Sequence, residues 1–128
     1  MILDLRIDGR ITAASVDALA TPLFAAVDRA APFAVLFDRR TMTAPTADGR
    51  EALEAAFARW EGVEAHCVAW ADLLDERRAG SLARATAAAA EAGEPEPHDH
   101  EHAYPQQTFT DEPAARAWLA AALAPVTA

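Results

Sequence analysis

The stretch that decides the fold lies near the end of the chain and reads Phe109-Thr110-Asp111-Glu112-Pro113-Ala114-Ala115-Arg116-Ala117-Trp118-Leu119. Thr110 can cap a helix, and the two acids after it favour the positive end of the helix dipole. Pro113 falls where a backbone N–H has no partner inside a helix. Trp118 and Leu119 supply large apolar side chains. We therefore expect a final helix that packs on a short central sheet.

Three segments upstream of this helix have the composition of β-strands. Residues 33–37 form a continuous apolar run, which favours a central strand covered on both faces. Residues 63–70 form a second buried strand that includes His66 and Cys67, which we interpret as core side chains rather than a catalytic pair. Residues 104–109 are predicted to form an edge strand, because Pro105 has no backbone donor.

The beginning of the chain has the pattern of a hairpin. Leu3, Leu5 and Ile7 alternate with charged residues, as in a half-buried strand. The dipeptide Asp8-Gly9 follows and leads into the short run 10–12. Because Asp-Gly favours a type I′ turn, we expect two short antiparallel strands here.

Helical patterns separate the strands. The first helix is capped by Thr12 or Ser15 and contains Pro22, which should kink or split it. The second is capped by Thr46 and ends near Gly62, which can take a left-handed conformation.

The elements together predict one α/β domain over residues 1–128. A third helix is expected over residues 72–90, before a polar and flexible loop at 93–103. Strands that alternate with helices imply a mostly parallel central sheet. We expect about five strands, including the antiparallel N-terminal hairpin, and about four flanking helices.

Composition excludes several classes of function. The net charge is −9 and the pI is about 4.7, which argues against nucleic-acid partners and anionic membranes. All eleven basic residues are arginine, so a P-loop lysine and lysine Schiff-base chemistry are excluded. The single cysteine excludes an internal disulfide. No apolar run approaches the length of a membrane span, and the N-terminus lacks the pattern of a signal peptide, so we expect a cytoplasmic protein.

Three stretches together resemble one known family. The chain is similar to SpoIIAA-like proteins of the STAS superfamily, the fold of bacterial anti-sigma-factor antagonists, and specifically to its uncharacterised members. The stretches that carry the resemblance are Asp8-Gly9-Arg10-Ile11-Thr12, Val35-Leu36-Phe37-Asp38 and the ending at residues 109–119. The ending is the most specific of the three, and its residues indicate how the final helix packs rather than any chemical activity.

The resemblance implies a regulatory role for the loop after Asp38. The best-known members are phosphorylated there on Ser or Thr and bind a kinase or a sigma-factor regulator. In place of their Asp-Ser-Ser-Gly-like sequence, this chain has a segment of different length that contains no serine. The candidate partner-binding or phosphoacceptor residues are therefore Asp38, Arg39, Arg40, Thr41, Thr43 and Thr46. The neighbouring arginines could pair with a phosphate or hold another anion, and Thr46 could equally be only a helix cap.

One polar segment has the spacing of metal ligands. In an extended conformation, His98, His100 and His102 would share a face, with Asp99 and Glu101 pointing away. Three histidines can hold a zinc ion, although solvated histidine-rich loops also bind metals opportunistically.

The leading hypothesis is a non-enzymatic regulatory or binding module that recognises a protein partner. No catalytic constellation is evident, and no cofactor is implied. The alternatives are a carrier of a small apolar ligand or lipid and a metal protein that uses the three histidines. A homodimer is a reasonable expectation, since most soluble oligomers are homo-oligomers.

Overall fold

The structure is a computed structural model that describes residues 1–93 and 102–127. The elements in chain order are β1 (Ile2–Arg6), β2 (Gly9–Ile11), α1 (Ala13–Asp28), β3 (Phe33–Asp38), β4 (Met42–Pro45), α2 (Ala47–Phe57), α3 (Glu61–His66), β5 (Cys67–Leu73), α4 (Glu76–Ala92), β6 (Gln106–Phe109) and α5 (Glu112–Thr127). None of the described helices is long and apolar enough to cross a bilayer.

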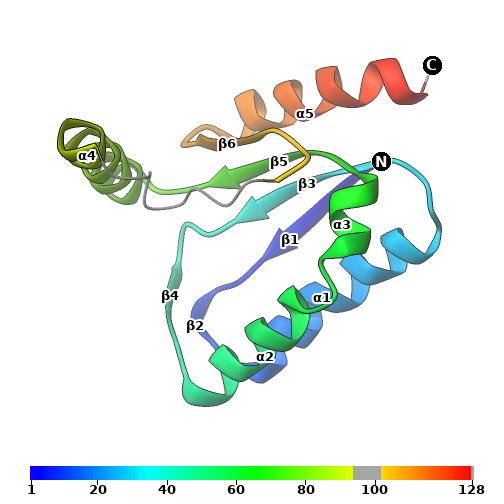
Figure 1. Ribbon diagram of the computed structural model, residues 1–128, viewed down its shortest axis with the longest axis horizontal. Coiled ribbons are helices and arrows are strands. Elements are labelled where there is room, and N and C mark those ends of the chain that lie inside the picture. Colours follow the sequence, from blue (N-terminus) through cyan, green and yellow to red (C-terminus); the bar gives the residue numbers. More distant parts are fainter. Residues whose placement is uncertain (94–101, 128) are drawn as a thin grey trace.

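The central sheet has four strands in the order β1-β3-β5-β6, and every neighbouring pair is parallel. This confirms the mostly parallel α/β architecture and the edge position of β6. Figure 1 shows α5 on one side of the sheet and α1, α2 and α3 on the other. It places α4 beyond the carboxyl ends of the strands.

Strand β3 joins the two halves of the core. Phe33 and Val35 belong to the cluster that packs against α1 and α3, whereas Ala34 and Leu36 belong to the cluster that packs against α5. All four side chains are buried. On the α5 side, Leu119 is fully buried, as expected for the final helix. The apolar run therefore fills two opposite layers at once, as a two-sided parallel strand requires.

The predicted antiparallel hairpin is wrong. The short strand β2 pairs with β4 in a separate parallel two-stranded sheet and does not fold back on β1. Only Gly9 has a positive φ here, of +70°, whereas a type I′ turn requires one at both central positions. The chain instead continues forward, so that Ile7 and Ile11 are buried with Val16. In the described part of the chain the central sheet consequently has four strands and not five.

The strand predicted from residue 63 is also wrong at its start. The segment after Trp60 forms the short helix α3, and β5 begins only at Cys67. A Cβ at Gly62 would lie 2.4 Å from the Val27 side chain, so this glycine allows α3 to approach α1 closely. With α3, the described residues contain five helices and not four.

Several helix boundaries also differ from expectation. The N-cap of α1 is Thr12, in a reciprocal capping box with Ser15, and the helix continues through Pro22 without splitting. The third predicted helix begins later, since Asp75 caps α4. At α5 the Asp111 carboxylate, rather than Thr110, accepts the capping bond from the Ala114 N–H at 3.1 Å.

Two helical glycines should respond to alanine in opposite directions. A Cβ at Gly49 would lie 1.9 Å from the Ile11 carbonyl oxygen, so Gly49→Ala should destabilise the protein by about 1–3 kcal/mol. At Gly80 the nearest atom is the flexible end of Arg84 at 3.4 Å, so Gly80→Ala should stabilise by about 0.5–1 kcal/mol. Urea unfolding of both variants measures the two effects. A Gly49→Ala variant as stable as the parent would contradict this packing.

Candidate functional site

Asp38 is the last residue of β3 and lies where the apolar part of the strand ends. Arg40 turns back onto it: its Nε donates to Asp38 Oδ1 at 3.1 Å and its Nη2 to Oδ2 at 2.8 Å. The Arg40 backbone N–H also donates to Oδ1, at 3.1 Å. The hydrogen bonds from the Arg40 guanidinium lower the pKa of Asp38, against the opposing effect of burial. Asp38 is therefore a fixed carboxylate at neutral pH.

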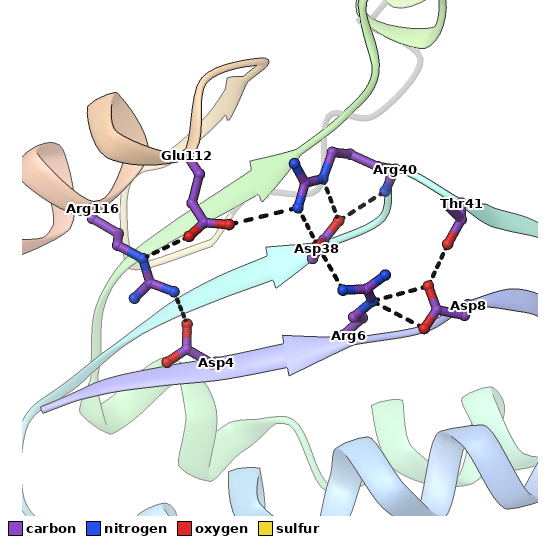
Figure 2. A network of polar contacts seen from close by, with 8 residues as sticks. All are labelled: Asp4, Arg6, Asp8, Asp38, Arg40, Thr41, Glu112 and Arg116. Atoms are coloured by element: carbon purple, nitrogen blue, oxygen red, sulfur yellow. Dashed lines mark hydrogen bonds and ion pairs between the residues drawn. The ribbon is translucent and has the colours of Figure 1, made fainter.

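This pair is the centre of a chain of alternating charges, which we call the edge network. Its members are Asp4, Arg6, Asp8, Asp38, Arg40, Thr41, Glu112 and Arg116, and Figure 2 shows them side by side. Each cation in the network contacts two anions, and the chain ends on the hydroxyl of Thr41. Such bridging fixes side chains that would otherwise be mobile at the surface.

The first half of the edge network connects β1 to α5. Arg116 Nη2 lies 2.5 Å from Asp4 Oδ1, and Arg116 Nε lies 3.2 Å from Glu112 Oε2 within the first turns of α5. Glu112 Oε1 is in turn 3.5 Å from Arg40 Nη2. Asp4 on β1 and Arg116 on α5 therefore meet although they lie more than a hundred positions apart in the sequence.

The second half runs along the end of β1. Arg6 Nη1 lies 3.9 Å from Asp38 Oδ2, and Arg6 Nε donates to both carboxylate oxygens of Asp8 at 2.9 Å. The Thr41 hydroxyl donates to Asp8 Oδ1. The hydrogen bonds from Thr41 and Arg6 lower the pKa of Asp8, so it also stays ionised at neutral pH.

The three candidate threonines have different surroundings. Thr41 is exposed and belongs to the edge network, whereas Thr43 is an exposed residue of β4, opposite Arg10. The predicted loop at 39–45 is thus partly a strand. Thr46 caps α2 by accepting from the Gly49 N–H at 3.1 Å, and its own hydroxyl is close to the Ile11 carbonyl and Asp48. Thr46 therefore has the structural role of a cap.

Arg39 turns away from the edge network toward a buried carboxylate. Its Nη1 lies 3.3 Å from Asp72 Oδ1, and Asp72 also accepts from Trp70 Nε1 at 3.2 Å and from Gln106 Nε2 at 2.7 Å. Asp72 is only 4% exposed. The Arg39 carbonyl accepts from Arg78 Nη1 at 2.6 Å. Sequence reasoning missed this cluster, because it placed Asp72 at a helix start instead of at the end of a buried strand.

Of the three proposed metal ligands, only His102 lies in the described part of the chain. His98 and His100 lie outside the described residues. His102 contacts Glu64 through Nδ1 and stacks on Tyr104 with ring centroids 4.6 Å apart. In residues 1–93 and 102–127, no group of three His, Cys, Asp or Glu side chains is arranged to hold a metal ion.

Two other features bear on the alternative functions. A surface depression of about 310 Å³ lies between α1 and the chain after α2, and its lining includes Asp17, Asp28 and Arg59 beside Phe24. This mixed and charged lining gives no support to an apolar ligand. Cys67 donates to the Ala69 carbonyl at 3.3 Å, and burial raises the pKa of its thiol to about 12, so it is a poor nucleophile.

Comparison with models of protein families, with curated proteins and with solved structures finds no match to this chain.

The Arg40–Asp38 pair predicts a defined pH dependence. Because the folded pKa of Asp38 is depressed, its contribution to stability is present above the unfolded pKa and disappears as the pH falls through the folded value. In Arg40→Gln the pKa of Asp38 should rise toward its ordinary value of 3.8, as measured by a carboxylate NMR titration.

The stability difference between Arg40→Gln and the parent should accordingly shrink on acidification from pH 7 to below the folded pKa of Asp38. The matched control is Arg50→Gln, at an exposed position in α2, whose difference from the parent should not follow the Asp38 titration. An unchanged Asp38 titration in Arg40→Gln would show that the guanidinium does not hold this carboxylate.

Proposed function

We propose that this protein is a non-enzymatic regulatory module that binds a protein partner through the edge network. The observation that carries the proposal is the arrangement of that network: opposite charges from β1, from the turn after β3 and from α5 alternate across one edge of the sheet. Its charged ends are exposed, so a partner can reach them without a change of fold.

The protonation states favour binding over acid–base catalysis. A general acid or base works best when its pKa lies near the working pH. Here the paired arginines and Thr41 lower the pKa of Asp8 and Asp38, which takes these values further from neutral pH. These carboxylates can accept hydrogen bonds from a partner, but they are poorly suited to proton transfer.

The pattern of charge also suggests the kind of partner. Arginine presents a planar set of donors that matches carboxylates, and Arg40 and Arg116 each have about two fifths of the side chain exposed. A polyanion would be repelled by the intervening acids and by the net charge of −9. A protein surface with both signs of charge fits better, and its association should weaken as salt is added.

Membership of the STAS superfamily is part of this proposal. Its support is the mostly parallel α/β architecture, together with the position of Asp38 at the end of a buried strand that leads into the Arg40–Thr41 turn. Thr41 is the exposed threonine of that turn. Thr46 lies after β4 and caps α2. If the regulatory loop of the family has a counterpart here, Thr41 is the residue that best fits it.

The test is an affinity capture from the organism that encodes the protein, followed by quantitative mass spectrometry. Arg40→Glu reverses the charge at the centre of the edge network, and Arg50→Glu makes the same change on α2. A partner captured by the parent and by Arg50→Glu should be recovered at least about tenfold less with Arg40→Glu, which corresponds to about 1.4 kcal/mol.

Circular dichroism and thermal unfolding of both variants provide the control for folding. Equal recovery of every reproducible partner with Arg40→Glu and Arg50→Glu would overturn the proposed surface. Absence of any reproducible partner, combined with stabilisation by a small molecule, would overturn the proposed class of function.

A further inference from the structure

Among the described residues, β1 is an edge strand of the central sheet, and one side of its backbone is unpaired. Its neighbour is β3, and Figure 2 shows it as the outer of these two strands. The Met1 carbonyl accepts from the Ala34 N–H at 3.0 Å, and the Ile7 N–H donates to the Asp38 carbonyl at 3.4 Å. Odd-numbered residues of this strand therefore direct their backbone groups toward β3.

The backbone groups of Asp4 and Arg6 must then point away from the sheet, because donors and acceptors alternate along a parallel strand. In the described part of the chain no hydrogen bond reaches either of these two N–H groups. Leu3 and Leu5 are buried on one face, while the side chains of Asp4 and Arg6 are 60% and 59% exposed on the other. The edge is thus open along its backbone and charged on its accessible face.

Only certain registers would allow two such edges to pair. In an antiparallel pair around a two-fold axis, outward-pointing residues must lie opposite one another to exchange both hydrogen bonds. With the axis at Asp4, Leu5 or Arg6, three registers satisfy this rule: Asp4 against itself, Asp4 against Arg6, and Arg6 against itself. Axes nearer the start of β1 also satisfy it, but they place Ile2 opposite itself or opposite Asp4 and pair no opposite charges. Of the first three, two oppose a residue to itself, namely Asp4 to Asp4 and Arg6 to Arg6. Both of these self-opposed registers bring like charges together, which destabilises a cross-strand pair.

The register that places Asp4 opposite Arg6 is self-complementary. With the two-fold axis at Leu5, Asp4 faces Arg6 of the partner subunit, and the same pair occurs again on the other side of the axis. Each pair exchanges backbone hydrogen bonds and also places opposite charges on the same face of the joined sheet. The alternation of Asp4 and Arg6 therefore favours this register over the others that are centred within β1.

The other edge strand, β6, has no pair of opposite charges that would favour one register of pairing. The Trp70 N–H donates to the Pro105 carbonyl and the Leu74 N–H to the Phe109 carbonyl, so the outward residues of β6 are Gln106 and Thr108. Both are uncharged, and the Gln106 side chain is held by Asp72. A proline beside an edge strand also discourages pairing.

We propose that the exposed edge of β1 is a homodimer interface. Two copies pair antiparallel through this strand around a two-fold axis at Leu5, with Asp4 against Arg6 of the partner subunit, and their four-stranded sheets become one continuous sheet. The paired strand shares Asp4 and Arg6 with the edge network, but the inference rests on the unpaired backbone of β1 and not on the proposed partner. Arg40 and Thr41 belong to the turn that follows β3 and are not part of the paired strand.

The test is sedimentation velocity of the purified full chain over a range of concentrations up to about 1 mM. The parent should show a monomer–dimer equilibrium. Asp4→Arg gives an edge with two arginines and Arg6→Asp an edge with two aspartates, so each variant alone should dimerise at least about tenfold more weakly. Arg50→Asp, an exposed charge reversal on α2, should dimerise like the parent.

The decisive sample is an equal mixture of Asp4→Arg and Arg6→Asp. In the proposed register every cross-strand pair of that mixture joins opposite charges, so heterodimers should form where neither variant self-associates. Hydrogen exchange of the parent should show concentration-dependent protection of the Asp4 and Arg6 amides, while Leu3 and Leu5 are protected at every concentration.

Three results would overturn the interface: a parent that is monomeric throughout this range, an Arg6→Asp variant that dimerises as strongly as the parent, or a mixture that stays monomeric. Because the measurement uses purified protein and Arg40→Glu should leave dimerisation unchanged, its outcome is independent of the capture experiment.

Discussion

The structure depends on the burial of β3 on both of its faces. Phe33 and Val35 fill the layer beneath α1 and α3, and Ala34 and Leu36 fill the layer beneath α5. Strand β3 has two apolar faces and a hydrogen-bonded neighbour on each side. Its register is therefore fixed both by the packing of its side chains and by its pairing with the two strands. Displacement of β3 would expose both layers together, so the helices, the other strands and the position of Asp38 all depend on this one placement.

The same constraint produces the edge network. Apolar burial in β3 ends at Asp38, and the first polar side chain after the core is held by Arg40. Because parallel strands end at a common edge, the end of β1 lies beside it, and α5 brings Glu112 to the same place. The charges meet there as a consequence of the topology, and the free side of β1 is left available at the boundary of the sheet.

The features that could be predicted were those encoded by neighbouring residues. The apolar run of β3, the cap at Thr12 and the burial of Leu119 follow from local patterns. The prediction of a hairpin was wrong although Asp8-Gly9 has the sequence of a tight turn. Burial of Ile7 and Ile11 against α1 and α2 stabilises the observed course of the chain more than the turn would stabilise a hairpin. At the site, Asp38 and Arg40 were proposed because the resemblance to SpoIIAA-like proteins implies a regulatory loop after a strand that ends in an acid.

Other parts of the site could not be inferred from one sequence. Arg116 reaches Asp4 from the opposite end of the chain, and no local pattern encodes such a contact. Likewise, Asp72 and Gln106 become partners only once β5 and β6 are placed side by side. Their pairing depends on the three-dimensional order of the strands, which is decided by competition among buried segments rather than by any single segment.

The most direct test of this account is native-state hydrogen exchange measured residue by residue. If β3 holds the two layers together, the amides of Val35 and Leu36 should exchange only through global unfolding, with an opening free energy equal to that from urea denaturation. Amides of α4, which lies beyond the ends of the strands, should open at lower free energy. Exchange in β3 as rapid as in α4 would contradict the central role of this strand.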